Sequence, residues 1–374
     1  AGGGAVADAG RGVLSARVEA ALRSVRAWDW LHVVLWVYVW GAVLVLHRVT
    51  PVFLNVFLAW MKEAMEAAGL SFAAISGVTF AAGMLLFMLP PVPGPPIYLF
   101  AGFVLPDRCP WGFWWGTAYC ILLCFVMKLA ACAVQQQLVG GCLSGSLWVR
   151  QTCGVHTPLM RAIERVLRQP GLSFGKVMIL CGGPDWPTSV LAGILRISLL
   201  QCLLGTCPVV ASVAPLTLSG AFYLRSGEGG FWIRIGNFMF GLTAVVSMGF
   251  WAGMAWAIQD EFEKGHAAIT APREEFVDLE WLDHRAAAIA QHSTVRWADM
   301  PRGIRVGFAG GALAITLVGH LFLWRSRLCF NAFALGDDLA ALAWSGPDGL
   351  LRLPGAVGLA VVAVAFAGLA PTLA

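Results

Sequence analysis

Hydrophobic residues follow one another in long runs along this chain, separated by short polar or proline-rich segments. A helix that crosses a bilayer needs about 20 apolar residues in succession, whereas a half-buried helix of a soluble protein alternates apolar and polar positions. The runs predict an all-α integral membrane protein with about six to seven transmembrane helices. They lie at residues 31–60, 70–89, 112–134, 197–224, 231–258, 306–324 and 355–370. Within the first, either 31–46 spans alone or it joins 52–60 in one bent element broken near Pro51.

Two further apolar segments are too short to cross. Residues 97–105 would extend only about 14 Å as a helix, which is half a bilayer, and residues 189–195 are shorter still. Both follow Gly/Pro clusters, and the two share a pattern: Pro93-x-x-Pro96-x4-Ala101-Gly102 and Pro184-x-x-Pro187-x4-Ala192-Gly193. The pattern predicts two re-entrant, broken-helix loops, near residues 90–106 and 182–196.

The topology of the two loops follows from what separates them. One full span, residues 112–134, lies between them, so loops that each return to their own side would open toward opposite faces. Paired Gly/Pro-interrupted segments of this kind are typical of inverted repeats with a site at the membrane midplane. Backbone that leaves a helix inside hydrocarbon needs hydrogen-bond partners, so we expect the two loops to meet each other away from lipid.

Ionisable residues at membrane depth are the candidate site. Asp185 lies in the second loop, Arg196 ends it, and Lys128 lies in the span between the loops. Such residues usually face a cavity or a partner, so we expect Asp185 to pair with Arg196 or Lys128 along a transport or lipid pathway. An alternative is that Asp185 caps a helix while the basic side chains extend to the headgroups. Gly102 and Gly193, which end the two motifs, are expected to allow the close approach of the loops. The full set of residues expected to shape the loops is Pro93, Gly94, Pro96, Gly102, Gly183, Pro184, Pro187 and Gly193.

The remaining segments are polar. Residues 1–28 are predicted to be a polar leader, and residues 135–176 a polar stretch whose helix after Thr157-Pro158 lies on the membrane surface. Residues 259–305 are the sizeable water-facing segment, a candidate site for a protein partner, between a membrane domain (29–258) and a C-terminal pair of spans (306–374).

Composition agrees with a membrane protein. Hydrophobic residues make up 59% of the 374 positions and charged residues 12%, about half of the usual soluble share, and the mean hydropathy is +0.74. The net charge of +4 gives no reason to expect nucleic acid as a partner. The ten cysteines contain no Cys-x-x-Cys pair, the histidines have no metal spacing, and no phosphate loop or nucleophile elbow occurs. We therefore expect no metal, no cofactor and no enzymatic activity.

Residues 70–230 resemble the VTT domain, the membrane domain of the DedA family and its eukaryotic relatives implicated in lipid scrambling. The resemblance rests on Pro93-Gly94-Pro95-Pro96, Ala101-Gly102 and the Gly112-to-Gly116 region. It continues in Leu195-Arg196-Ile197-Ser198 and in Leu203-Leu204-Gly205-Thr206 with Pro208 close behind. The acidic residues that many DedA members carry around the first loop have no counterpart in residues 90–105. The resemblance thus implies the fold and a lipid-handling role rather than a proton-coupled mechanism.

Three functions are consistent with this pattern. The first hypothesis is a lipid scramblase or lipid-handling transporter whose partners are membrane lipids. The second is an ion- or proton-coupled transporter of a small solute that uses the same cleft. The third is a membrane scaffold that does not transport and recruits partners through residues 259–305.

Overall fold

The computed structural model describes residues 16–90, 92–293, 297–331 and 349–373, which form helices joined by short turns with no β-strand among them. The chain divides into two compact units. Unit 1 contains α1 (Ala16–Arg26), α2 (Trp30–Ala67) as far as Val45, α15 (Arg302–Trp324), α16 (Ser326–Cys329) and α17 (Leu353–Leu373). Of the predicted leader, residues 1–15 lie outside the described residues.

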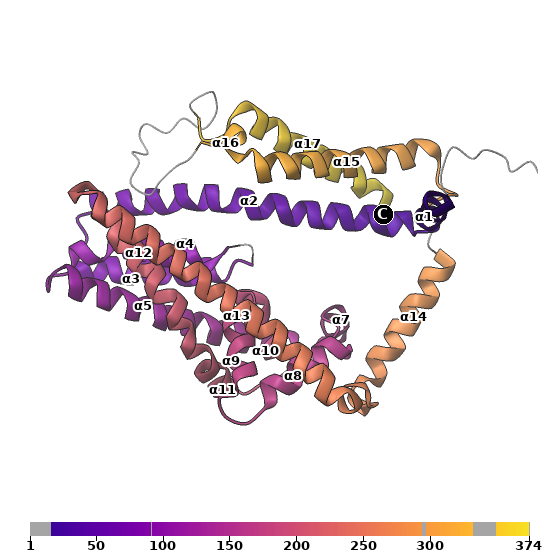
Figure 1. Ribbon diagram of the computed structural model, residues 1–374, viewed down its shortest axis with the longest axis horizontal. Helices are drawn as coiled ribbons and strands as arrows, with labels where there is room; N and C mark the ends of the chain where they lie inside the picture. The colour runs from indigo at the N-terminus through magenta and orange to yellow at the C-terminus, as the bar shows by residue number, and fades with distance from the viewer. Residues whose placement is uncertain (1–15, 91, 294–296, 332–348, 374) are drawn as a thin grey trace, which may run out of the picture. The chain divides into compact units, whose positions relative to one another are not determined.

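Unit 2 contains the rest of α2 and the elements that follow it (Figure 1). In chain order these are α3 (Phe72–Phe87), α4 (Gly94–Val104), η1 (Pro106–Arg108), α5 (Phe113–Val134), the π-helix η2 (Gln135–Gly140), α6 (Gly141–Leu143), α7 (Leu147–Thr152), α8 (Pro158–Arg168), α9 (Phe174–Gly182), α10 (Asp185–Ile194), α11 (Leu199–Thr206), η3 (Cys207–Val209), α12 (Val210–Leu224), η4 (Ser226–Glu228), α13 (Gly230–Thr270), η5 (Glu274–Phe276) and α14 (Val277–Ser293).

Five helical segments of the described chain are long and apolar enough to cross a membrane: Trp30–Ala67, Phe113–Leu143, Leu199–Leu224, Gly230–Thr270 and Arg302–Trp324. The first is one continuous helix with Pro51 inside it, which agrees with the single-element alternative. Residues 70–89 were expected to form a full span, but α3 has only 16 residues and extends about 24 Å. It ends at Phe87 because the proline-rich segment that follows cannot continue a helix.

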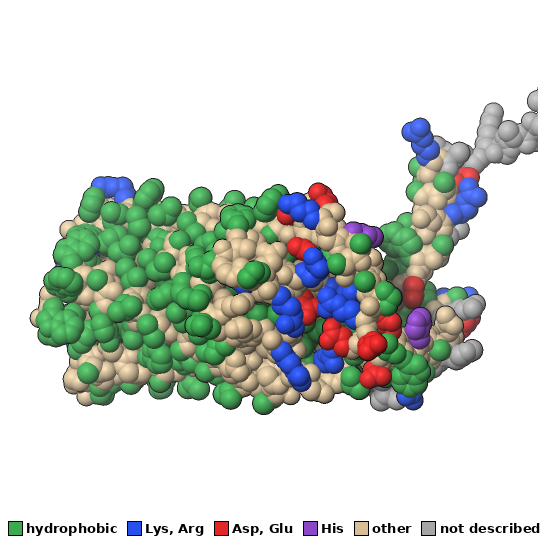
Figure 2. Space-filling model, turned by 90° about the horizontal axis from the view of Figure 1, so that it is seen from below, with side chains coloured by type: hydrophobic (Ala, Val, Ile, Leu, Met, Phe, Trp, Pro, Cys, Tyr) green, Lys and Arg blue, Asp and Glu red, His purple; other side chains and the backbone are tan. Residues whose placement is uncertain are grey.

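Large apolar side chains cover the surface of these helices. On α13, Phe238, Val245 and Met248 are each more than 60% exposed. Figure 2 shows a face of the molecule that is hydrophobic over most of its area, with charged side chains gathered toward one end. A contiguous apolar surface of this kind is unfavourable in water and is expected for helices in lipid. The five long apolar helices and this exposed apolar surface are compatible with a membrane protein.

The segment after α5 differs from the prediction. Residues 135–140 were expected to begin a polar stretch, but they continue α5 as a π-helix in which Gln135 and Gln136 are buried. Helix α8, which was expected to lie on the membrane surface, packs on the end of α13. Its Arg161 and Glu164 are buried against the protein, and Arg161 donates to the carbonyl oxygens of Ala268 and Ala271 at the end of α13.

Unit 1 has its own core, in which the first part of α2 packs with α15 and α17. The ring of Tyr38 meets that of Phe366 edge to face at 5.4 Å, and Ile315 lies fully buried against Gly41. The predicted C-terminal pair of spans thus belongs to a unit that also includes the N-terminal part of α2.

Candidate functional site

Two helical hairpins of unit 2, α3–α4 and α9–α10, bring their tips together. Helices α4 and α10 both begin directly after the first proline of their shared motif, at Gly94 after Pro93 and at Asp185 after Pro184. The two tips line one cavity of about 520 Å³. Helix α4 lies along α12 and α9 lies along α13 (Figure 1), so each hairpin is held by a long helix of the same unit.

An ion pair joins the second tip to α5. Lys128 Nζ donates to Asp185 Oδ1 at 2.6 Å, and both residues line the cavity. The Lys128 side chain is 4% exposed and that of Asp185 is 38% exposed, so the carboxylate is the partner that faces the open space. Lys128 also lies over the ring of Phe87, 5.9 Å from its centroid, and therefore contacts the end of α3 as well. It occupies the midpoint of the segment Phe113–Leu143.

Gly94 and Asp185 hold equivalent positions in the two motifs, and they face each other. A methyl group added at Gly94 would lie 2.9 Å from Asp185 Oδ2 and 3.2 Å from Phe87 Cε1. Both residues also lie in the first turn of their helices, where unpaired N–H groups and the helix dipole create a positive potential. The absence of a side chain at Gly94 leaves room for the carboxylate of Asp185 between the two helix starts.

The glycines that end the motifs pack in the same manner in both repeats. A methyl group on Gly102 would overlap the carbonyl oxygen of Thr217 in α12, and one on Gly220 would overlap that of Leu99 in α4. In the second repeat, Gly193 meets the carbonyl oxygen of Gln136. Gly140 in turn meets that of Val190, so each short helix packs backbone to backbone on the span that follows the other hairpin. Leu99 and Val190 are equivalent positions of the motif, and the reciprocal contacts therefore match position for position.

Two buried glutamines in η2 bind one backbone carbonyl in each hairpin, beside the tip in the first and at the end opposite the tip in the second. Gln135 Nε2 donates to the carbonyl oxygen of Phe87 at 2.7 Å, and Gln136 Nε2 donates to that of Ile197 at 2.7 Å. Phe87 ends α3 and Ile197 follows α10, so these amides satisfy carbonyl groups that a helix end leaves without a partner. The π-helix directs consecutive side chains to both hairpins, as such bulges often do at functional sites.

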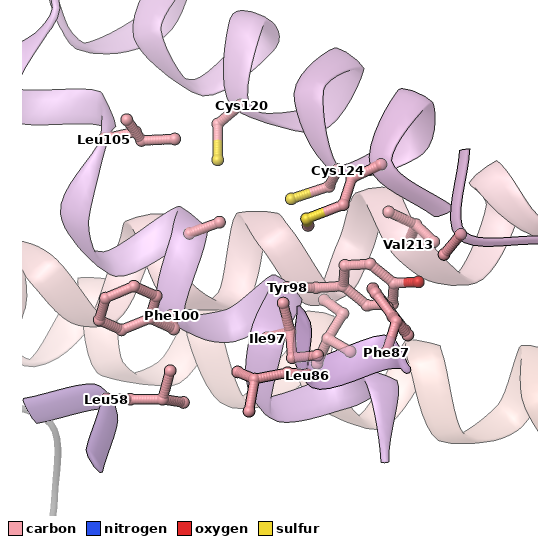
Figure 3. Packing of buried hydrophobic residues seen from close by; sticks show 14 of the residues in the cluster. Leu58, Leu86, Phe87, Ile97, Tyr98, Phe100, Leu105, Cys120, Cys124 and Val213 are labelled. Atoms are coloured by element: carbon pink, nitrogen blue, oxygen red, sulfur yellow. The ribbon is translucent and has the colours of Figure 1, made fainter. Parts of the chain in front are cut away.

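Two polar atoms of the cavity lining have no hydrogen-bond partner among the described residues. They are the hydroxyl of Tyr98, a side chain that is 5% exposed, and the indole Nε1 of Trp186. Figure 3 shows the Tyr98 ring beside Phe87, with its hydroxyl on the side of Val213. Phe87 and Val213 line the same cavity. Both residues line the cavity, but these two atoms are themselves shielded from it.

The predicted site residues fall into two groups. Those that line the cavity are Pro93, Gly94, Lys128, Gly183, Pro184, Asp185 and Pro187, whereas Pro96, Gly102, Gly193 and Arg196 do not. Asp185 pairs with Lys128, so the alternative of Arg196 as its partner is wrong. Asp185 begins α10 and Arg196 follows its end, so about 15 Å of helix separates them. Gly102 and Gly193 approach opposite spans, not each other, because both lie two helical turns from the tips.

Comparison of the chain with protein-family models, with curated proteins and with solved structures finds no match. The site is therefore interpreted from its own geometry.

Several lining residues were not expected from the sequence. Tyr98, Trp186, Thr243 and Ser247 supply polar groups to the cavity, and His47 of α2 also lines it. Tyr98 and Trp186 lie within the two motifs, Trp186 directly at its tip and Tyr98 one turn after its tip, so these positions could have identified them. Thr243 and Ser247 lie four residues apart on one face of α13, but such residues are common in spans and carry no signal of their own.

Proposed function

We propose that unit 2 translocates membrane lipids, as a scramblase or lipid-handling transporter of the VTT/DedA type. The observation that carries the proposal is the single cavity lined by both hairpin tips and by the Lys128–Asp185 pair. Its position at the middle of an apolar 31-residue helical segment corresponds to the depth at which a headgroup meets its highest barrier.

The ion pair suits a zwitterionic headgroup. Lys128 can bind the phosphate while Asp185 binds the amine, so the headgroup replaces one ion pair with two and leaves no charge without a partner. Trp251, which is 61% exposed, also lines the cavity, so the cavity reaches the surface beside α13 and the acyl chains can stay in lipid.

The matched glycine contacts support the inverted-repeat part of the proposal. Gly102 with Gly220 and Gly193 with Gly140 make equivalent backbone contacts to opposite spans. Two hairpins related in this way enter the membrane from opposite faces and leave a thinned barrier between their tips.

Reconstitution into vesicles tests the proposal. Purified protein should accelerate the transfer of a fluorescent phospholipid between leaflets, and Asp185→Asn and Lys128→Met should each reduce that rate at least tenfold. Asp260→Asn is the matched control, because it removes an acid from an exposed ion pair with Lys264 (2.8 Å) outside the cavity. A wild-type rate equal to that of empty vesicles would contradict the proposal.

The Lys128–Asp185 pair is also consistent with a second function. An aspartate that faces an open cavity beside a buried lysine can exchange a proton, which is the chemistry of an ion-coupled transporter of a small solute. Solute uptake that follows the pH gradient and is lost in Asp185→Asn, without any lipid transfer, would favour this function over the first.

A further inference from the structure

A second cavity lies at the opposite end of α10 from the hairpin tips. It has a volume of about 190 Å³ and shares no lining residue with the tip cavity. Its polar lining consists of Ser144, Arg150, Glu164, Arg168, Arg196 and Glu275. The Ser144 hydroxyl donates to the carbonyl oxygen of Gly141 at 2.8 Å, so the donors suited to an anion are the three guanidinium groups.

Two of the three arginines have no ion-pair or hydrogen-bond partner for their side chains among the described residues, namely Arg150 and Arg196. The third, Arg168, donates from Nε to Glu164 Oε1 at 2.7 Å and from Nη2 to the carbonyl oxygen of Leu195 at 2.9 Å. It is thereby fixed in place beside the other two.

The carboxylates of the cavity are already neutralised. Glu164 is 7% exposed and binds both Arg168 and Arg273, and Glu275 binds Arg273 at 3.3 Å. The charges of Arg150 and Arg196 are therefore left for a ligand. These two guanidinium groups repel a cation and attract an anion, so the ligand that suits the cavity is negatively charged.

Arg196 has a backbone conformation that normally selects glycine. Its φ of 53° is the one positive value at a non-glycine residue among the described residues. The N–H of Ile197 donates to the carbonyl oxygen of Ala192, and that of Arg196 to the carbonyl oxygen of Gly193. Arg196 therefore follows the C-cap residue Leu195 at the C′ position of a Schellman motif. Glycine would adopt this conformation without strain, and an arginine there reduces stability. A side chain kept at such a position points to a role beyond the fold.

We propose that this cavity binds a phosphate group, through Arg150 and Arg196, with Arg168 completing the site. Arginine forms paired hydrogen bonds to phosphate oxygens. The volume is below the roughly 300–1,000 Å³ of pockets that hold larger ligands, so it suits a single phosphate and not a whole nucleotide. The phosphate belongs either to a lipid headgroup or to a soluble ion. The inference is independent of the proposed function, because it rests on a separate cavity.

Thermal unfolding of the full-length protein in detergent tests the site with two probes. One is inorganic phosphate, compared with sodium chloride at equal ionic strength, and the other is monomeric dihexanoyl phosphatidate, compared with dihexanoylglycerol. At saturating concentration, a binding probe should raise the melting temperature by roughly 3 °C or more. A shift with phosphate identifies a soluble ion as a ligand, a shift with the lipid alone identifies the headgroup, and either supports the site.

Arg196→Gly separates binding from folding. Because glycine suits the positive φ, this variant should melt at or above the wild-type temperature without probe and should lose the shift. Arg196→Asn, which also tolerates this conformation, gives the same readout should the glycine variant fold poorly. Arg150→Gln should lose the shift as well. Arg302→Gln, an exposed arginine of unit 1 that does not line the cavity, should keep it. No shift in the wild type with either probe, or a full shift in Arg196→Gly, would overturn the proposal.

Discussion

Lys128 shows how one residue can connect several elements of this fold. Its ammonium group is withdrawn from solvent at the middle of an apolar helix, where a charge without a partner is costly. Asp185 provides the compensating charge, and the side chain that would have occupied the same space in the first hairpin is absent at Gly94. The local geometry therefore depends on three residues: the buried cation Lys128, the partly exposed anion Asp185 and Gly94, which has no side chain opposite the anion.

The ion pair should respond unequally to removal of its two members. Asp185→Asn leaves the buried Lys128 charge without a partner and should cost about 1–3 kcal/mol, less than a fully buried pair because Asp185 is 38% exposed. Lys128→Met should cost less, since the remaining carboxylate faces the cavity. The double variant should regain most of the loss. Denaturant or thermal unfolding in detergent measures all three, and equal, additive losses would contradict this assignment.

Gly94→Ala should disturb the pair without removing a charge. The new methyl group would lie 2.9 Å from Asp185 Oδ2, so either the carboxylate or α4 must move, at about 1–3 kcal/mol in stability. Lipid transfer should slow in parallel. Gly77→Ala in α3 is the matched control, because nothing lies within 4 Å of its added methyl group. It should stabilise the helix by roughly 0.5–1 kcal/mol, and equal behaviour of the two variants would count against the close approach of Gly94 and Asp185.

At the scale of elements, the short helices α4 and α10 are held by backbone contact with the span that follows the other hairpin. Glycine is required there because the carbonyl oxygens of Thr217 and Gln136 occupy the space that a side chain would need. The π-helix η2 adds the amides of Gln135 and Gln136, which bind the end of each hairpin. The positions of both tips therefore depend on the glycine contacts two turns away from them, and that of the first tip also on Gln135, which binds Phe87 beside it.

Gly193→Ala should separate α10 from η2. A backbone carbonyl cannot yield as a flexible side chain can, so the loss in stability should reach the upper part of the range of about 1–3 kcal/mol for overpacking. Gly102→Ala should behave alike, since it is the equivalent position on α12. Gly249→Ala in α13, with nothing within 4 Å, should melt at or above the wild-type temperature, because its added methyl group meets no neighbour and favours the helix. Melting temperatures of the three variants in detergent decide the matter.

Helix α14 should loosen in acid through one carboxylate. The amide of Gln151, and His156 beside it, hold the pKa of Asp283 below its ordinary value. A lowered pKa stabilises the folded state above the unfolded pKa, and this stabilisation is lost as the pH falls through the folded value, below about pH 4. Protection of α14 from hydrogen exchange, corrected for intrinsic rates, should therefore decrease in that range. Asp283→Asn should be less protected at neutral pH and lose this pH dependence, whereas Asp278→Asn on the same helix should keep it.

For the whole molecule, the sequence predicted the apolar helices and the two short, proline-led segments, because prolines and insufficient length leave few alternatives. It did not predict the burial of Gln135 and Gln136, whose amides are satisfied only by carbonyl groups 48 and 61 residues away. The burial of α8 depends likewise on a distant partner, the end of α13. The exclusion of Arg196 as the partner of Asp185 needed only helix geometry, since the two residues lie at opposite ends of α10.

Photolabelling can show directly whether a lipid headgroup occupies the cavity between the hairpin tips. Full-length protein would be reconstituted with a phospholipid that carries a diazirine on its headgroup, irradiated and digested, and the labelled residues identified by mass spectrometry. Labels are expected at the residues of both tips that line the cavity, and they should disappear in Asp185→Asn. These residues are Pro93, Gly94, Pro95 and Tyr98 in the first tip and Gly183, Pro184, Asp185, Trp186 and Pro187 in the second. Labels confined to the ends of the long helices, with none at either tip, would contradict headgroup binding in this cavity.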